Sequence, residues 1–289
     1  MNVDGVTSAR TFLFMPGDRP DRFAKAMASG ADAVVLDLED AVAPSRKQEA
    51  LAHVVGFLAQ PADDAAGPSV VVRVNPLNSA GVEDELTALA GVGRPLVVMV
   101  PKAESPVVLA EIVALLPAGS GTIPLLETAA GLLDVREVAA APGVLRLAFG
   151  HLDLCAQLGL SPDDDRRLGP ARFALVVASA AASLPPPVDG VSTAITDDDE
   201  TTRATRSAVA SGFTGKLCIH PRQVAVVHEA LLPTGAEVAW ARSVAGSAPG
   251  EGASSVDGEF VDRPVLLRAE ALLARARGAA RDGSEQLQG

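Results

Sequence analysis

Cysteine is scarce in this chain, and long apolar runs are missing. Only two cysteines, Cys155 and Cys218, occur in 289 residues, and neither belongs to a CxxC pair. That count excludes a disulfide framework and predicts a reducing compartment. The longest nearly apolar stretch, residues 174–184, is too short to cross a bilayer. Because the first residues also lack the basic-then-apolar pattern of a signal peptide, we expect a cytoplasmic protein without membrane contact.

Runs of basic residues are missing as well, and the net charge is −12. A protein that binds duplex nucleic acid usually presents a basic face, so that class is excluded. One local exception gathers Arg10, Arg19, Arg22 and Lys25 around the first expected strand and helix. This patch fits either the phosphates of a small ligand or an ordinary solvated helix face.

A glycine-rich dinucleotide loop is a third absence. The first strand leads into Pro16-Gly17-Asp18-Arg19-Pro20 rather than GxGxxG, which disfavours a doubly wound open sheet. Apolar, β-branched runs alternate with helix-length stretches along the chain. Eight such runs are expected to be strands: 11–15, 33–38, 69–74, 95–100, 122–126, 145–149, 188–194 and 216–219. The pattern predicts an α/β fold, a (β/α)8 TIM barrel over residues 1–232.

Residues 233–289 are expected to form a C-terminal helical extension. A helix is predicted at 237–244, a linker rich in Gly, Ser and Ala at 247–257, and a further helix at 260–277. A lid or arm that contacts a neighbouring subunit fits this pattern as well as a helix packed on its own barrel.

Several expected strands end in a charged or polar residue, and all strand C-termini of a barrel open onto one face. Glu127 and Asp153 follow the fifth and sixth strands and are the best metal-ligand candidates. Two carboxylates with water or substrate oxygens suit Mg²⁺, and no His/Cys set with zinc spacing exists in the sequence. His220 follows the eighth strand, either as a general base or as a structural histidine.

Arg73 ends the third strand, where its fork can bind a substrate carboxylate. A structural ion pair with Glu39 or Asp40 is the alternative. Asp37, Glu39 and Asp40 follow the second strand and alternate in direction, so at least one is expected to reach metal-bound water. Lys102 would hold this acidic cluster together electrostatically.

Seven segments in order resemble the citrate lyase β-subunit-like branch of the HpcH/HpaI aldolase family, and they span nearly the whole chain. They are the motifs FLFMPGDRP (12–20), AVVLDLEDAV (33–42), VRVN (72–75), VPKAES (100–105), PLLETA (124–129), GKLCIHP (215–221) and VDRPV (261–265). One departure is visible: many relatives read Gly-x-Glu-Asp-Leu where this chain has Gly150-His151-Leu152-Asp153-Leu154. The aspartate is kept and the glutamate is lost, which leaves substrate identity open.

The resemblance implies a Mg²⁺-dependent lyase, with Mn²⁺ as an alternative metal, acting on a short hydroxyacyl-CoA thioester such as malyl-, citramalyl- or hydroxymethylglutaryl-CoA. It implies a homotrimer or homohexamer. The site residues it implies are Glu127 and Asp153 for the metal, Arg73 for the substrate carboxylate, Asp262 for catalysis, and Arg19, Arg22 and Lys25 for the CoA phosphates. To these we add Glu39 and Asp40 as catalytic candidates beside Arg73 and Asp262, and Pro16 as a residue of the CoA site. Asp262 would be donated by a neighbouring protomer.

Three other functions stay open from the sequence. A CoA-independent 2-oxo acid aldolase would use the same metal and arginine without needing the basic patch. A malyl-CoA thioesterase would release free malate. A non-catalytic barrel that holds acyl-CoA would not need Asp262.

Overall fold

The computed structural model describes residues 3–61, 67–246, 254–256 and 259–285. The chain divides into two compact units, Met1–His228 and Glu229–Gly289. The division falls close to the boundary expected after Leu232. Each unit is described by itself.

The first unit is a closed barrel of eight parallel strands. The strands pair in sequence order, and β8 pairs with β1 to complete the ring. Their bounds are β1 Thr11–Pro16, β2 Ala33–Asp37, β3 Ser69–Arg73, β4 Val97–Val100, β5 Gly121–Leu126, β6 Ala148–Phe149, β7 Val188–Asp189 and β8 Gly215–Cys218. The prediction of a (β/α)8 barrel is confirmed.

Two of these strands are shorter than predicted. The apolar pattern favoured strands at 145–149 and 188–194, whereas β6 and β7 hold two residues each. They pair with each other only through Ala148 and Val188. Apolar alternation continues past Asp189 as far as Val191, but the chain there has no ladder partner, so periodicity alone overestimated the strand.

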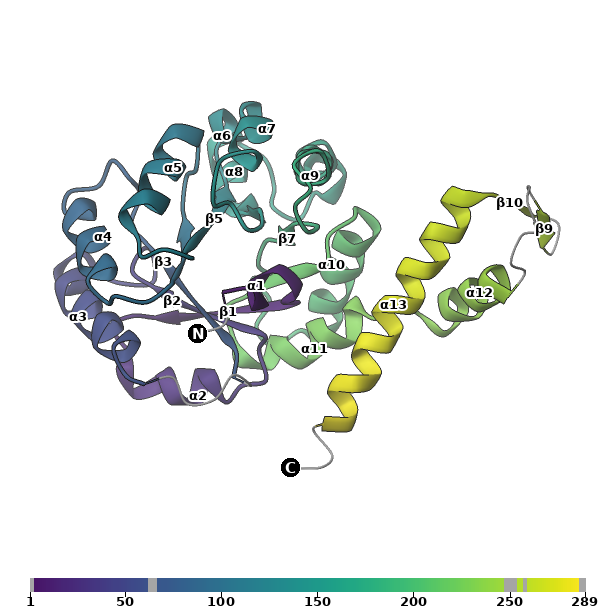
Figure 1. Cartoon of the computed structure of the whole chain (residues 1–289), viewed down its shortest axis with the longest axis horizontal. Coiled ribbons are helices and arrows are strands. Elements are labelled where there is room, and N and C mark those ends of the chain that lie inside the picture. Colours follow the sequence, from purple (N-terminus) through teal and green to yellow (C-terminus); the bar gives the residue numbers. More distant parts are fainter. Residues whose placement is uncertain (1–2, 62–66, 247–253, 257–258, 286–289) are drawn as a thin grey trace. The chain divides into compact units, whose positions relative to one another are not determined.

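Helices surround the strands of the barrel in a ring (Figure 1). Their bounds are α1 Gly5–Ser8, η1 Pro20–Arg22, α2 Phe23–Met27, η2 Pro44–Arg46, α3 Lys47–Leu58, α4 Val82–Ala90, α5 Pro106–Leu115, α6 Ala129–Leu133, α7 Val135–Ala139, α8 His151–Leu158, α9 Asp165–Ala181, α10 Asp198–Ala210 and α11 Pro221–Leu231. The single helix expected at 128–140 is broken at Asp134, and the helix expected from Pro170 begins earlier, at Asp165. None of the helices in the described ranges combines the length and apolar character that a membrane crossing requires.

The amino end of the barrel is closed by α1 and by a buried arginine. Arg146 is 1% exposed, and its guanidinium donates to the carbonyls of Val6 (3.2 Å) and Ala9 (2.6 Å) and to Thr214 Oγ1 (2.9 Å). Burial lowers the pKa of Arg146 to about 10. Val6 packs into the same apolar core as the strand residues Phe12 and Leu217. This closed floor leaves the carboxyl end of the strands as the face for chemistry.

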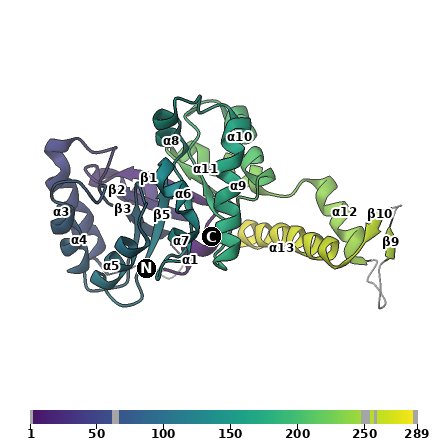
Figure 2. The same ribbon diagram turned by 90° about the horizontal axis from the view of Figure 1, so that it is seen from above.

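The second unit pairs two helices, α12 Gly235–Gly246 and α13 Arg263–Glu285, which lie side by side in both views (Figures 1 and 2). Their core includes Ala241 and Ala269, and the Arg268 guanidinium lies 4.8 Å from the centre of the Trp240 ring. The predicted linker at 247–257 lies mostly outside the described residues. Its residues 254–256 form β9 (Ser254–Val256), which pairs with β10 (Glu259–Val261). The helix expected from 260 therefore begins only at Arg263.

Candidate active site

Strand register aligns the first site residues at the carboxyl end of the barrel. Pro16 pairs with Asp37, and Asp37 pairs with Arg73, so the last residues of β1, β2 and β3 lie at one level. Glu127 comes directly after β5, whose last residue Leu126 pairs with Phe149. Arg73 and Glu127 therefore lie at the same end of the barrel, as expected from the rule that the carboxyl ends of all strands share one face.

Arg73 is held by acidic side chains rather than being free. Its Nε and Nη2 donate to the two carboxylate oxygens of Asp37 at 2.7 and 2.6 Å, and Nη1 lies 2.7 Å from Glu39 Oε2. Burial alone would lower the pKa of Arg73, but the hydrogen bonds and charge of Asp37, together with the charge of Glu39, raise it, so the guanidinium stays charged. The structure thus contains the ion pair with Glu39. Asp40 is exposed.

Glu127 is a strongly perturbed carboxyl group at this end of the barrel. It is 2% exposed, and burial, then the charges of Glu39 and Asp153, raise its pKa to about 8. Its Oε1 accepts a hydrogen bond from the backbone N–H of Lys102 at 2.9 Å. Lys102 adopts a left-handed backbone with φ of 49°, which is uncommon for a residue with a Cβ and is often found at functional sites. The exposed side chain of Lys102 is turned to solvent while its amide holds the carboxylate.

Glu39 is buried beside Arg73, and its pKa is raised to about 7. Burial is the main cause, and the neighbouring charges of Asp40 and Asp37 add to it, while Arg73 opposes it. Its Oε2 lies within ion-pair distance of Arg73 without an aligned hydrogen bond. A carboxyl group with a pKa near neutrality can accept or release a proton at physiological pH.

Asp153 follows β6, as expected, and lies in the first turn of α8. Because β6 ends at Phe149, α8 begins at His151 and carries Asp153 on its third residue. Asp153 is half-buried and near enough to raise the pKa of Glu127. The two carboxylates therefore face one region from neighbouring βα units.

This donor set fits a hard divalent cation. Within the described ranges no three His, Cys, Asp or Glu side chains are arranged as a metal cluster. Mg²⁺ needs only one or two protein carboxylates and fills its other positions with water or substrate oxygens. A buried Glu127 whose pKa is raised partly by two other carboxyl groups is a place where a cation would relieve repulsion.

The basic patch is only partly assembled. Arg19 and Arg22 lie in the turn after β1, where Arg19 donates to Asp21 at 3.0 and 2.8 Å and Arg22 lies 4.0 Å from the same carboxylate. Lys25 is exposed on α2. Arg10, in contrast, precedes β1 at the amino end and lies 3.7 Å from Asp32. Grouping Arg10 with the patch was wrong, because a whole strand separates it from Arg19.

Asp262 belongs to the second unit. It precedes α13, where its Oδ1 accepts the N–H of Val265 at 3.2 Å, and it is half-buried. His220 is exposed, and its Nδ1 accepts the N–H of Arg222 at 3.1 Å, so it serves the start of α11.

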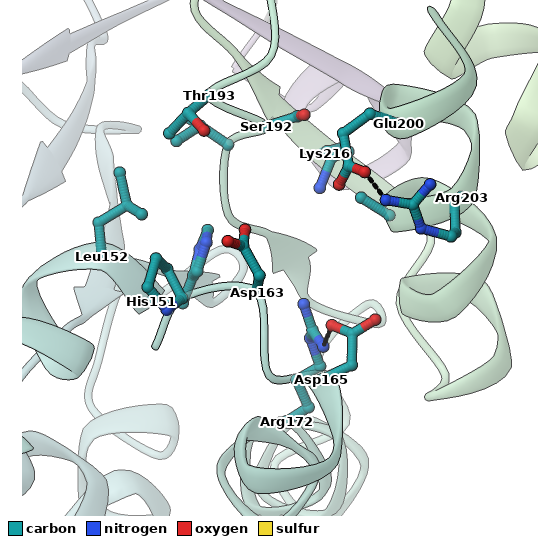
Figure 3. Close-up of a pocket in the computed structure, with 13 residues that line it drawn as sticks. His151, Leu152, Asp163, Asp165, Arg172, Ser192, Thr193, Glu200, Arg203 and Lys216 are labelled. Atoms are coloured by element: carbon teal, nitrogen blue, oxygen red, sulfur yellow. Dashed lines mark hydrogen bonds and ion pairs between the residues drawn. The ribbon is translucent and has the colours of Figure 1, made fainter. Parts of the chain in front are cut away.

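A hollow of about 390 Å³ adjoins α8 and was not anticipated (Figure 3). Of the side chains that line it, Arg172 pairs with Asp165, also a lining residue, at 2.6 Å. Arg172 and Lys216 each also lie 3.0 Å from the carboxylate of Asp189, which is buried behind them. Burial lowers the pKa of His151, which also lines the hollow, to about 4, so that ring is neutral. The sequence feature that could have revealed this hollow is the presence of two charged residues, Asp189 and Lys216, inside otherwise apolar strands.

Comparison with known proteins gives a consistent picture. A family model described as HpcH/HpaI aldolase/citrate lyase matches residues 10–221. A citrate lyase subunit beta-like protein of Mycobacterium tuberculosis is 39% identical over 274 residues, covering 92% of this chain and 94% of the relative. A (3S)-malyl-CoA thioesterase of Cereibacter sphaeroides is 31% identical over 285 residues, covering 95% and 97%. The mitochondrial citramalyl-CoA lyase of Rattus norvegicus is 31% identical over 292 residues, covering 92% and 86%.

Among solved structures, the fold is similar to that of CitE from Mycobacterium tuberculosis in complex with magnesium, acetoacetate and coenzyme A. The TM-score is 0.80 at 38% sequence identity, and the match covers 93% of this chain and 99% of that one.

Proposed function

The chain belongs to the HpcH/HpaI aldolase/citrate lyase family, as its motifs predicted, and it is a lyase by that membership; we propose that it cleaves or condenses a short hydroxyacyl-CoA thioester with Mg²⁺. The observation that carries this proposal is Glu127, a buried carboxyl group whose pKa is raised to about 8 beside Glu39 and Asp153. The CoA and magnesium in the similar CitE structure support the same substrate class and metal.

Glu127 and Asp153 would hold Mg²⁺, which when bound supplies a Lewis acid for the substrate's hydroxyl and carboxylate oxygens. Arg73 would bind the substrate carboxylate through Nη1, the nitrogen that now faces Glu39. Because the pKa of Glu39 is about 7, its carboxyl group is partly protonated at neutral pH, so a substrate carboxylate would replace a partner that is only partly charged. Arg19, Arg22 and Lys25, next to Pro16, would bind the phosphates of CoA.

The reaction we propose is a retro-Claisen cleavage. Asp262 of a neighbouring protomer would take the hydroxyl proton. Glu39 and Asp40 would balance the charge at the carboxyl end of the barrel. The oxygen's electron pair becomes the carbonyl of an oxo acid as the carbon–carbon bond breaks. The released pair enters the thioester enolate, which takes up a proton to give the acyl-CoA. Donation of Asp262 between protomers requires a homo-oligomer, a trimer or hexamer in this proposal.

A product assay tests the proposal. Malyl-, citramalyl- and hydroxymethylglutaryl-CoA would be incubated with the protein in Mg²⁺ and in chelator, and the oxo acid and acyl-CoA quantified. Chelator-sensitive release of both products in equal amounts supports the lyase and identifies the substrate. Cleavage of free 4-hydroxy-2-oxo acids that CoA does not inhibit, with no thioester turnover, would favour the aldolase.

A thioesterase is the second candidate, because a relative of that name covers 95% of this chain. It would release a free hydroxy acid and the CoA thiol, and no oxo acid. Titrating free thiol in the same assay separates the two reactions.

A further inference from the structure

The loop after β2 is held by hydrogen bonds to both its backbone N–H groups and its backbone carbonyls. On one side the carboxylate of Asp37 accepts the N–H groups of Glu39 at 2.9 Å and Ala41 at 3.1 Å while it holds Arg73. On the other side two consecutive carbonyls, those of Leu38 and Glu39, point at one ammonium group. The backbone from which the Glu39 side chain departs is therefore fixed through its donors and its acceptors.

That ammonium group belongs to Lys47, the first residue of α3. Its Nζ donates to Leu38 O at 2.7 Å, to Glu39 O at 2.6 Å and to Asn75 Oδ1 at 2.7 Å. All three protons of the ammonium group are thereby used within the protein. A lysine that served only as a solvated helix residue would leave them to water.

Asn75 connects this lysine to a buried carboxylate on the next helix. Its backbone N–H and its Nδ2 donate to the two oxygens of Glu85 in α4, at 2.8 and 2.6 Å. Glu85 is 5% exposed. The amide of Asn75 thus accepts from a cation and donates to an anion, which fixes its orientation and ties the loops after β2 and β3 together.

We propose that Lys47, supported by Asn75 and Glu85, is a positioning residue that holds the loop carrying Glu39 in the geometry that sets Glu39 against Arg73. The inference rests on the proposed function for its catalytic consequence. Lys47 itself touches neither the proposed metal ligands nor the basic patch. Its loss should therefore lower kcat, through misplacement of Glu39, and leave CoA binding and the contact of Arg73 with Asp37 largely unchanged.

The test compares Lys47→Met with wild type in two readouts. Steady-state kinetics should give a kcat lowered about 10- to 100-fold with KM within about threefold. Hydrogen exchange without substrate should become faster at the amides of residues 39–42 and stay unchanged in β5. Wild-type kcat in folded Lys47→Met, or exchange that rises equally throughout the barrel, would overturn the inference.

Rescue separates the ammonium group from the mere bulk of the side chain. Lys47→Cys can be aminoethylated at the new thiol, because the native Cys155 and Cys218 are 2% and 0% exposed. The modified side chain restores an ammonium group at nearly the original length, so kcat and the slow exchange of residues 39–42 should return. Failure of both to return in a folded protein would contradict the proposal.

A milder variant decides the question if the Lys47 variants do not fold. Glu85→Gln keeps the shape of the side chain and removes its charge, and it should lower kcat severalfold with KM unchanged. Glu83→Gln, the same change at an exposed position of α4, is the matched control and should behave as wild type. Equal kcat in both variants would overturn the proposal. If wild type turns over no thioester, the proposed function fails, and hydrogen exchange still decides whether Lys47 positions the loop.

Discussion

Gly150 lies directly against the side chain of Glu127. A Cβ at position 150 would lie 2.5 Å from the Cβ of Glu127 and closer still to its Oε2. The φ of Gly150 is −99°, an ordinary value, so the glycine is needed for space and not for an unusual backbone. The approach lets the start of α8, which carries Asp153, lie against the carboxylate of Glu127.

Gly150→Ala should therefore displace Glu127 and lower Mg²⁺-dependent turnover at least about 10-fold, because a small shift of a metal ligand is costly. The measurement is kcat against Mg²⁺ concentration. Gly56→Ala in α3, where a Cβ would meet nothing within 4 Å, is the control and should keep full activity. Wild-type kinetics in Gly150→Ala would show that Glu127 does not need its present position.

A substitution of Lys102 tests whether activity depends on its backbone N–H or on its side chain. Lys102→Gly keeps the N–H that binds Glu127 and removes the ammonium group. We expect kcat within about threefold of wild type. The free energy of unfolding should change by less than about 1 kcal/mol, because relief of the left-handed backbone offsets the greater freedom of the unfolded chain. A loss of activity above about 10-fold would instead support an electrostatic role for the Lys102 side chain.

The lowered pKa of Asp32 predicts how the free energy of unfolding depends on pH. Although burial alone would raise its pKa, the hydrogen bond and charge of His228, with help from Arg10, lower it to about 2. A carboxyl group with a lowered folded-state pKa stabilises the protein above its unfolded value near 4, and this contribution is lost as the pH falls toward 2.

Asp32→Asn should therefore lower the free energy of unfolding by about 2 kcal/mol at pH 7. Urea unfolding of both proteins at pH 7 and pH 3 measures this, and the difference should be smaller at pH 3. A difference that does not change between the two pH values would mean that the charge of Asp32 is not what stabilises the barrel.

Asp262 allows a complementation test of the shared site. Asp262→Asn and Glu127→Gln should each be inactive alone. Oligomers formed from an equal mixture of the two variants should regain up to about a quarter of wild-type activity. In that share of the sites, random mixing places an intact Glu127 next to an intact Asp262 of the neighbour. No recovery in oligomers shown to be mixed would exclude donation of Asp262 by a neighbour.

The barrel could be predicted from sequence because its strands are short apolar runs with helices between them. The ends of β6 and β7 could not, since a strand ends where its ladder partner ends and the sequence does not display partners.

The shared position of Arg73 and Glu127 could be predicted because barrel topology places strand ends on one face, whereas their roles stay predictions. Lys47 and Glu85 were missed, because each lies in the first turns of a helix, where charged residues are common and no spacing marks them. Arg146 escaped notice for a related reason: three of its four hydrogen-bond partners are backbone carbonyls, which leave no trace in a sequence.

The measurement that tests the central claim most directly is oxo acid release from a hydroxyacyl-CoA thioester by wild type and Glu127→Gln across a Mg²⁺ titration. The account predicts saturable dependence on Mg²⁺ in wild type, loss of activity in chelator, and at least about a 100-fold lower kcat in the variant. Equal activity of the two proteins, or turnover that persists in chelator, would contradict it.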